Sequence, residues 1–85
     1  MYLHLGNNVV KALSSIICIF DLDISSHSPI TREFLRRAEL SGDVVDVSGD
    51  LPKSFVVTEE DGIRKVYLSQ LASSTLRGRA ETLSI

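Results

Sequence analysis

Leu51-Pro52-Lys53-Ser54-Phe55-Val56-Val57-Thr58 contains a clear β-strand signal, and the other expected elements are placed relative to it. Residues 54–58 are mostly apolar or β-branched and lie between two turn-forming segments, 49–52 and 59–62, which is the pattern of a buried central strand. Because Pro52 has no N–H group to donate, the strand is expected to begin at Lys53 or Ser54. The run 63–68 follows the acidic turn, so the two runs are predicted to pair as a hairpin.

The N-terminal part of the chain predicts further extended segments. Residues 2–5 alternate weakly and end at a turn cluster, 6–8, after which Val9-Val10 restarts an extended run; this pattern predicts a second hairpin. Residues 11–14 are expected to form a short turn. Residues 15–21 are continuously apolar at their centre, which favours a strand that is buried on both faces.

One helix is marked by its own end signals. Ser28 is suited to be the N-cap, and Pro29 then occupies the first helical position, where its missing N–H costs nothing. Ser41-Gly42 marks the end, so we expect a helix over about residues 29–40. The apolar residues that share one face of this helix are Ile30, Phe34, Leu35 and Ala38.

The remaining segments complete the predicted fold. Residues 43–47 predict a short strand, and residues 73–75 begin a C-terminal helix that Gly78 weakens by roughly 1 kcal/mol relative to alanine. The apolar positions of this helix are Leu76, Ala80 and Leu83. The fold class is therefore α+β: a single domain over residues 1–85, with a small, mostly antiparallel β-sheet, one well-defined helix and a short C-terminal helix.

Length and composition limit the function classes. A chain of 85 residues buries only about 60 to 65% of its unfolded surface, so its core is thin, and oligomerisation is a common way to bury more. Hydrophobic residues make up 44% of the chain and charged residues 24%, which argues against disorder. The net charge of −2 disfavours a basic surface over the whole protein but leaves room for one local basic face.

The chain has a single cysteine, Cys18, inside an apolar run, so no intrachain disulfide can form. With only His4 and His27 beside it, no zinc-ligand set is expected, and we interpret Cys18 as a buried small apolar residue in a reducing, cytoplasmic setting. Residues 1–5 do not have the pattern of a signal peptide, and no apolar run approaches the ~20 residues of a membrane span. A membrane partner is therefore not expected.

Two acidic clusters, Asp21 with Asp23 and Glu59-Glu60-Asp61, raise the question of acid–base catalysis or ion binding. Neither cluster has the spacing of a calcium loop, and we interpret both as solvated strand ends or turns. No catalytic histidine spacing and no glycine-rich phosphate loop is present in the sequence. We therefore expect no enzyme, no catalytic residue, no metal, no cofactor and no small-molecule substrate.

The basic residues indicate a different chemistry. If they converge on one face they can neutralise phosphates, for which the planar fork of arginine is well suited. The alternative is that the helix arginines are ordinary solvated residues, with Glu33 pairing to Arg36 or Arg37. The candidate phosphate contacts are Lys53, Arg77 and Arg79, and in second place Arg32, Arg36 and Arg37.

A family resemblance adds to these patterns. The opening 1–6, then Ile19-Phe20-Asp21, the segment 31–35, the run 52–58, and finally 67–69 with 73–76 together resemble the extracellular matrix regulatory protein B family of Gram-positive bacteria. The match is in order and covers nearly the whole chain. The ordered set of motifs is fairly specific.

The resemblance implies a function. The related A-type protein resembles a LytTR-type DNA-binding fold and forms rings whose arginine-lined surface binds DNA upstream of biofilm matrix genes. A small, non-enzymatic, oligomeric transcription regulator in the bacterial cytoplasm is therefore implied, with DNA and further copies of itself as partners.

The sequence departs from the related pattern at three places. Where the A-type relative has an arginine-rich turn, this chain has Gly49-Asp50-Leu51-Pro52-Lys53, in which only Lys53 is positive. Gln70 occupies the place of an expected proline, and Gly78 that of a usual lysine.

The leading hypothesis from the sequence is a DNA-binding regulator of matrix genes that acts as a homo-oligomer. The alternative is a protein-interaction or scaffold module of the same regulatory system that does not bind DNA.

Overall fold

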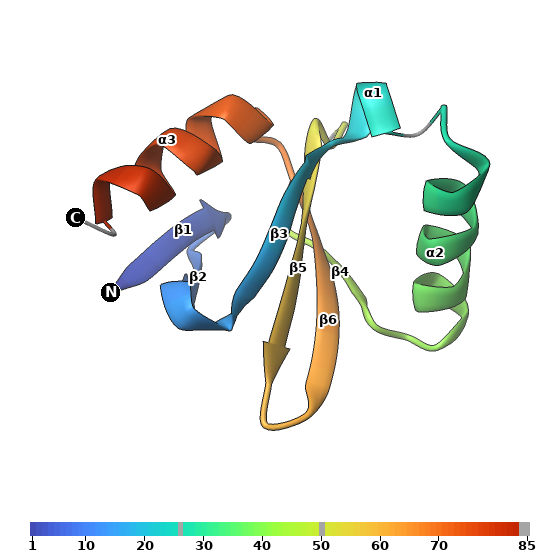
Figure 1. The fold of residues 1–85 in the computed structure, drawn as a ribbon, viewed down its shortest axis with the longest axis horizontal. Helices are drawn as coiled ribbons and strands as arrows, with labels where there is room; N and C mark the ends of the chain where they lie inside the picture. The colour runs from blue at the N-terminus through green and yellow to red at the C-terminus, as the bar shows by residue number, and fades with distance from the viewer. Residues whose placement is uncertain (26, 50, 84–85) are drawn as a thin grey trace.

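The structure, a computed structural model, describes residues 1–25, 27–49 and 51–83 of the chain. It confirms the α+β class (Figure 1). In chain order the elements are β1 (Tyr2–Gly6), β2 (Val9–Ala12), the 3₁₀ turn η1 (Leu13–Ser15), β3 (Ile16–Asp21), α1 (Leu22–Ser25), α2 (Pro29–Leu40), β4 (Val44–Asp46), β5 (Ser54–Glu60), β6 (Ile63–Ser69) and α3 (Ser73–Leu83).

The predicted hairpin of β5 and β6 forms the middle of a four-stranded sheet in the order β3-β5-β6-β4. Its antiparallel register runs from Ser54 opposite Ser69 to Glu60 opposite Ile63. The two residues between the strands, Asp61 and Gly62, have φ angles of 53° and 79°, which is the left-handed backbone of a tight hairpin turn. β3 pairs with β5 antiparallel, and β4 pairs with β6 parallel.

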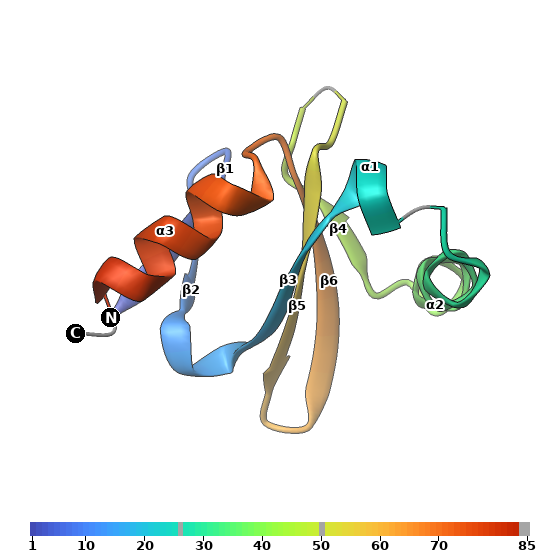
Figure 2. The same ribbon diagram turned by 45° about the horizontal axis from the view of Figure 1, so that its top comes forward.

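β5 is central because both of its faces are covered. Val56, on one face, joins a core with Leu3 and Leu76, which come from β1 and α3. Phe55 and its neighbours on the other face pack against α2. Figures 1 and 2 show this arrangement: the β1–β2 hairpin and α3 lie on one side of the sheet, and α2 lies on the other. A strand between two such layers needs apolar residues on both faces, which explains the unbroken apolar run at 55–57.

The predicted N-terminal hairpin is present as a separate two-stranded sheet. A close approach fixes its position: a Cβ at Gly6 would lie 3.2 Å from the carbonyl oxygen of Val47, and Gly6 has a φ of 131°, so glycine is required there. The Ser69 hydroxyl donates a hydrogen bond to the carbonyl oxygen of Leu5, which ties the hairpin to the main sheet. The expected turn at 11–14 lies slightly later, because β2 continues to Ala12.

The helix signals at 28–42 are confirmed. The Ser28 hydroxyl oxygen accepts a hydrogen bond from the Thr31 N–H at 3.5 Å, and Gly42 follows the helix with a φ of 74°. The C-terminal helix is also present as α3, in which Leu76 is fully buried.

Two burial expectations were wrong. β3 forms, but it is an edge strand of the sheet, and the side chains of Ile17 and Phe20 are 52% and 39% exposed. Ile30 was expected on the buried face of α2 and is 82% exposed. The reason is that α2 packs on the sheet through Phe34, Leu35 and Ala38, so that neither its first turn nor the outer strand is fully covered.

Candidate nucleic-acid interface

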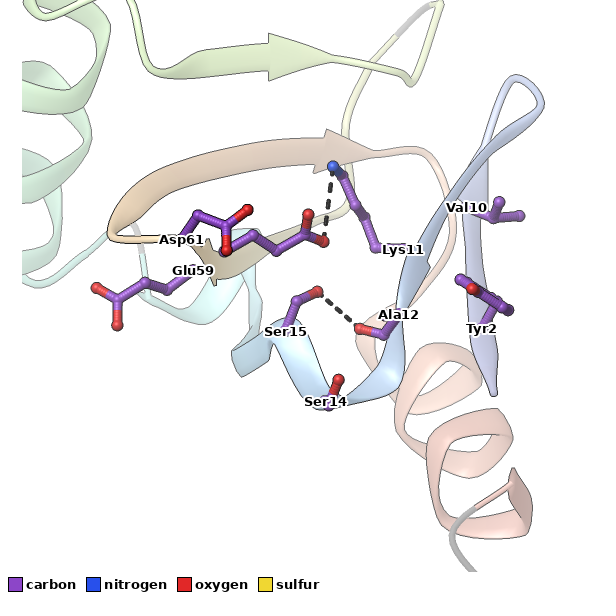
Figure 3. A pocket seen from close by; sticks show the side chains of 9 residues that line it. Tyr2, Val10, Lys11, Ala12, Ser14, Ser15, Glu59 and Asp61 are labelled. Carbon is purple, nitrogen blue, oxygen red and sulfur yellow. Dashed lines mark hydrogen bonds and ion pairs between the residues drawn. The ribbon is translucent and has the colours of Figure 1, made fainter.

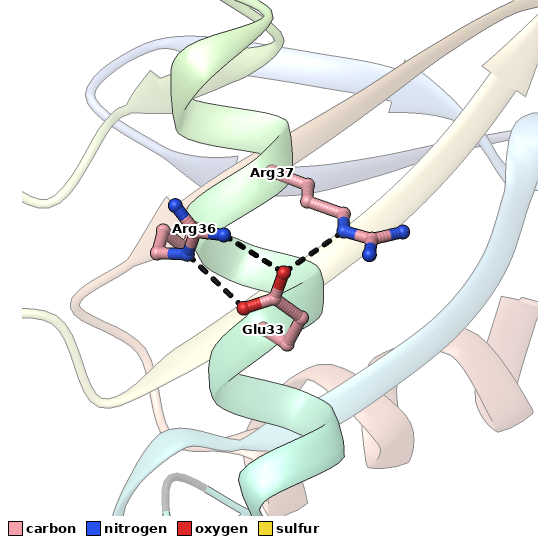
Figure 4. A network of polar contacts seen from close by, with 3 residues as sticks. All are labelled: Glu33, Arg36 and Arg37. Atoms are coloured by element: carbon pink, nitrogen blue, oxygen red, sulfur yellow. Dashed lines mark hydrogen bonds and ion pairs between the residues drawn. The ribbon is translucent and has the colours of Figure 1, made fainter.

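The arginines of α2 are partly neutralised by one carboxylate (Figure 4). Arg36 donates from Nε to Oε2 of Glu33 at 3.0 Å and from Nη2 to Oε1 at 2.9 Å, and Arg37 donates from Nε to Oε1 at 2.9 Å. These hydrogen bonds lower the pKa of the Glu33 carboxyl to about 2, and those from Arg36 contribute most to the shift. The pairing considered from spacing alone is therefore present, and it involves both arginines. A phosphate would have to compete with Glu33 for them.

Arg32 lies on the same helix and is exposed. No hydrogen bond or ion pair joins its side chain to another residue in the described part of the chain. The helix α2, which carries all three of these arginines, lies on the opposite side of the sheet from α3 (Figure 2). The six candidate phosphate contacts consequently divide into an α2 group and a second group that consists of Lys53, Arg77 and Arg79.

Lys53 is held where β3 ends, and Arg77 contacts a residue within β3. The backbone N–H of Lys53 donates to the Ser69 carbonyl at 2.8 Å, and its carbonyl accepts from the Leu22 N–H at 2.9 Å, which leaves the side chain exposed. Arg77 Nη2 donates to the carbonyl oxygen of Ile19 at 2.6 Å. Among the described residues, neither side chain has a carboxylate partner. Both therefore keep their charge available for an anion.

Two acidic residues lie beside the backbone contact of Lys53. Asp21 and Asp23 flank Leu22, whose N–H binds the Lys53 carbonyl. Asp23 is exposed, so its negative charge reduces the local positive potential. Asp50 belongs to the turn that stands in place of the arginine-rich turn of the A-type relative, and it lies outside the described residues.

Arg79 lies on a different side of α3. Successive residues of an α-helix turn by about 100°, so Arg77 and Arg79 point in roughly opposite directions. Arg79 lines a groove between α3 and β1, together with Tyr2 and His4. The alternation of exposed Tyr2 and His4 with buried Leu3 was a signal of an outward-facing strand surface, but it did not by itself indicate this groove.

The acidic cluster at 59–61 forms the exposed tip of the β5–β6 hairpin. Lys11 Nζ lies 3.9 Å from Oε1 of Glu60 (Figure 3). Arg64 Nη2 lies 3.3 Å from Oε1 of Glu59. The length of β5, about 20 Å, separates this tip from Lys53. Since salt screens exposed charges over about 8 to 10 Å, the tip has little effect on an anion at Lys53.

The described residues contain no group of three histidine, cysteine, aspartate or glutamate side chains arranged to hold a metal ion. Cys18 is half-buried and packs with the core beneath α2, and burial is the main cause that raises the pKa of its thiol. Within 1–25, 27–49 and 51–83, every helix is too short or too polar to cross a membrane.

Comparison with known proteins places the chain in a family. Residues 2–80 match the family described as RemA-like, extracellular matrix regulatory protein A-like. The chain is 41% identical over 81 residues to the extracellular matrix regulatory protein B of Bacillus subtilis (strain 168), and the match covers 95% of this chain and 91% of that protein. Both findings confirm the resemblance drawn from the sequence. The chain therefore belongs to the RemA-like family of extracellular matrix regulatory proteins.

Proposed function

We propose that this protein is a cytoplasmic transcription regulator that binds DNA upstream of extracellular matrix (biofilm) genes and acts as a homo-oligomer. Membership of a family of extracellular matrix regulatory proteins supports a role in the control of matrix genes. DNA binding is supported by the state of the charged side chains, and oligomerisation by exposed apolar residues.

The observation that carries DNA binding is that Lys53 and Arg77 have no carboxylate partner among the described residues, in contrast to Arg36 and Arg37. Glu33 occupies Arg36 and Arg37, whereas no described carboxylate pairs with Lys53 or Arg77. Arg77 uses one N–H on a neutral carbonyl, so its other N–H groups remain free to donate to a phosphate. Contacts of this kind position DNA without reading bases, and any sequence preference then comes from DNA shape or bending.

Homo-oligomerisation supplies what one subunit lacks. Few cations on each subunit give weak binding, but linked subunits raise the overall affinity steeply. An apolar groove of about 340 Å³ lies between β3 and α2, lined in part by the exposed side chains of Ile17, Phe20 and Ile30. Exposed apolar residues gathered in this way favour a protein contact.

The test measures DNA affinity and particle mass together. A fluorescent duplex is titrated with wild type, Lys53→Glu and the matched control Lys65→Glu, which makes the same charge change toward the acidic end of β6. We expect Lys53→Glu to weaken binding about tenfold or more and Lys65→Glu to have a small effect. Asp23→Asn should strengthen binding, because it removes a negative charge near Lys53. Light scattering on the same samples should show one common oligomer.

The dependence on salt provides the decisive control. Wild-type affinity should fall steeply between low and moderate salt, with a slope of about −0.9 for each phosphate neutralised. Absence of binding at low salt, or affinity that does not change with salt, rejects the proposal for DNA. A monomer at all concentrations rejects the homo-oligomer.

A protein-interaction module without DNA binding is the second candidate, and the groove between β3 and α2 favours it. In that case the exposed apolar side chains contact a partner protein, and the net charge of −2 disfavours binding to polyanions such as DNA. The titration separates the two functions, because a module of this kind assembles without binding the duplex.

A further inference from the structure

We propose that the groove between β1 and α3 binds an extended, carboxylate-bearing peptide segment of a partner protein, which adds to β1 as a third strand. The β1–α3 groove has a volume of about 620 Å³, and α3 runs beside β1 along its length (Figure 1). The residues that line it are Tyr2, Leu3 and His4 of β1, and Ser74, Thr75, Gly78, Arg79 and Thr82 of α3.

The groove follows the open edge of a strand. Consecutive strand residues point to opposite faces, so a groove lined by Tyr2, Leu3 and His4 runs along the edge of β1 and not over one face. The Met1 carbonyl accepts a hydrogen bond from the Leu13 N–H at 2.9 Å, so Met1 and Leu13 form a hydrogen-bonded pair at the end of the β1–β2 ladder. Hydrogen-bonded pairs occur at every second position of an antiparallel ladder, so Leu3 and Lys11 form the next one. The N–H and C=O groups of Tyr2 and His4 therefore point away from β2.

These outward groups are the usual attachment points for an added strand. No backbone hydrogen bond from another described element reaches Tyr2 or His4. An extended peptide supplies the alternating N–H and C=O groups that such an edge requires. A DNA backbone cannot pair with it in this way, which is why a peptide fits the groove better than a nucleic acid.

The helix side leaves room for the peptide. The α3 residues that line the groove recur at the spacing of one helical stripe, and except for Arg79 all of them are small or carry a hydroxyl. At the centre of the stripe, a Cβ placed on Gly78 would meet no atom within 4 Å. The wall of the groove is therefore open at Gly78, and a side chain of the peptide can enter there.

Charge specifies the chemistry of the partner. Arg79 and the imidazole of His4 line the groove, and among the described residues no carboxylate does. A peptide that carries aspartate or glutamate beside its apolar residues complements this lining. Tyr2 is largely exposed at the same groove, and tyrosine and arginine are the residue types that most often dominate the energy of a protein interface. The groove is thus a second surface, in addition to the proposed contact of Lys53 and Arg77 with DNA.

The test uses a displayed library of linear peptides of roughly ten residues, selected on the folded wild-type protein. Recovered peptides are synthesised with a fluorescent label and titrated against wild type, Gly78→Phe and Gly78→Ala. Gly78→Phe fills the groove and leaves the charge unchanged, whereas Gly78→Ala adds one methyl group. We expect peptides rich in carboxylates, with affinity reduced about tenfold or more by Gly78→Phe and nearly unchanged by Gly78→Ala. Amide NMR shifts should map the bound peptide to β1 and α3.

Thermal melting of Gly78→Phe checks that the variant is folded. Lys53→Glu should leave peptide binding intact, so failure of the DNA proposal and failure of this one are distinguishable. Recovery of no peptide, or equal affinity for wild type and Gly78→Phe, rejects the proposal. If a DNA duplex displaces the peptides and Gly78→Phe loses DNA binding as well, the groove belongs to the DNA surface and the peptide proposal is also rejected.

Discussion

The guanidinium of Arg77 in α3 donates a hydrogen bond to the carbonyl oxygen of Ile19 in β3, at 2.6 Å. β3 is an edge of the main sheet, and the outer groups of an edge strand can pair with another chain. The charged guanidinium of Arg77 occupies one of these groups, the carbonyl oxygen of Ile19. The same side chain therefore protects the sheet edge and remains a candidate contact for phosphate.

Replacement of Arg77 by alanine should reduce both stability and DNA affinity. Loss of the hydrogen bond to Ile19 is expected to lower the free energy of unfolding by about 1 kcal/mol. Arg79→Ala is the matched control on the same helix and should change stability little, because no hydrogen bond joins Arg79 to a described residue. Urea denaturation measures both variants. Equal stability of the two would show that the contact with Ile19 contributes nothing.

The pairing of Glu33 with Arg36 and Arg37 predicts a dependence on pH. Its folded-state pKa, about 2, lies below the unfolded value of about 4.3. The pairing therefore stabilises the fold above that unfolded value, and the effect is lost as the pH falls toward 2. We expect the difference in unfolding free energy between wild type and Glu33→Gln to be small at neutral pH, because the pair is exposed, and to vanish in this acid range.

Salt provides the control for this pH prediction. At about 1 M salt the stability difference between wild type and Glu33→Gln should also disappear at neutral pH. A difference that persists in high salt, or that grows as the pH falls, would contradict the ion-pair explanation.

Two glycine-to-alanine substitutions should have opposite effects on stability. Gly62 has a φ of 79° in the hairpin turn, so Gly62→Ala is expected to destabilise the protein by about 1 kcal/mol or more. Gly78 is helical and has open space at its Cβ position, so Gly78→Ala should stabilise by up to about 1 kcal/mol. Thermal denaturation of the pair tests both the turn and the helix. Shifts of the same sign would be inconsistent with this backbone geometry.

Two phenylalanines that stack on each other should differ in their importance for the fold. The rings of Phe20 and Phe55 are 4.9 Å apart, but Phe55 is fully buried and Phe20 is partly exposed at the sheet edge. Phe55→Ala should cost about 3 to 5 kcal/mol, which is enough to unfold much of a small domain. Phe20→Ala should cost about 1 kcal/mol. Circular dichroism during urea titration measures both, and similar losses would mean that β3 is not an open edge.

The sequence predicted those features that depend on neighbouring residues. The turn within 59–62, the helix start at Ser28-Pro29 and the buried central strand at 54–58 all follow from local chemistry, and the structure has each of them. Glu33 could be paired with Arg36 and Arg37 because residues three and four apart share one helix face.

Features set by contacts between distant segments could not be predicted in this way. The exposure of Ile17 and Ile30 depends on which strand lies at the edge of the sheet and on where α2 packs. The local sequence pattern determines neither the strand order nor the position of the helix. The contact of Arg77 with Ile19 joins segments far apart in the chain, and the β1–α3 groove likewise needs both termini in place. The candidate phosphate contacts were chosen by residue type, and only the fold shows that α2 holds three of them apart from the others.

The two faces of β5 have a consequence for how the molecule comes apart. Val56 belongs to the layer built from the chain termini, and Phe55 to the layer beneath α2, so neighbouring residues of one strand hold both layers. When β5 detaches, both layers lose the strand on which they pack. We therefore expect neither layer to remain folded without the other. Heat or urea should therefore dismantle the protein in a single step, and the amides of β5 should be the last to exchange with deuterium.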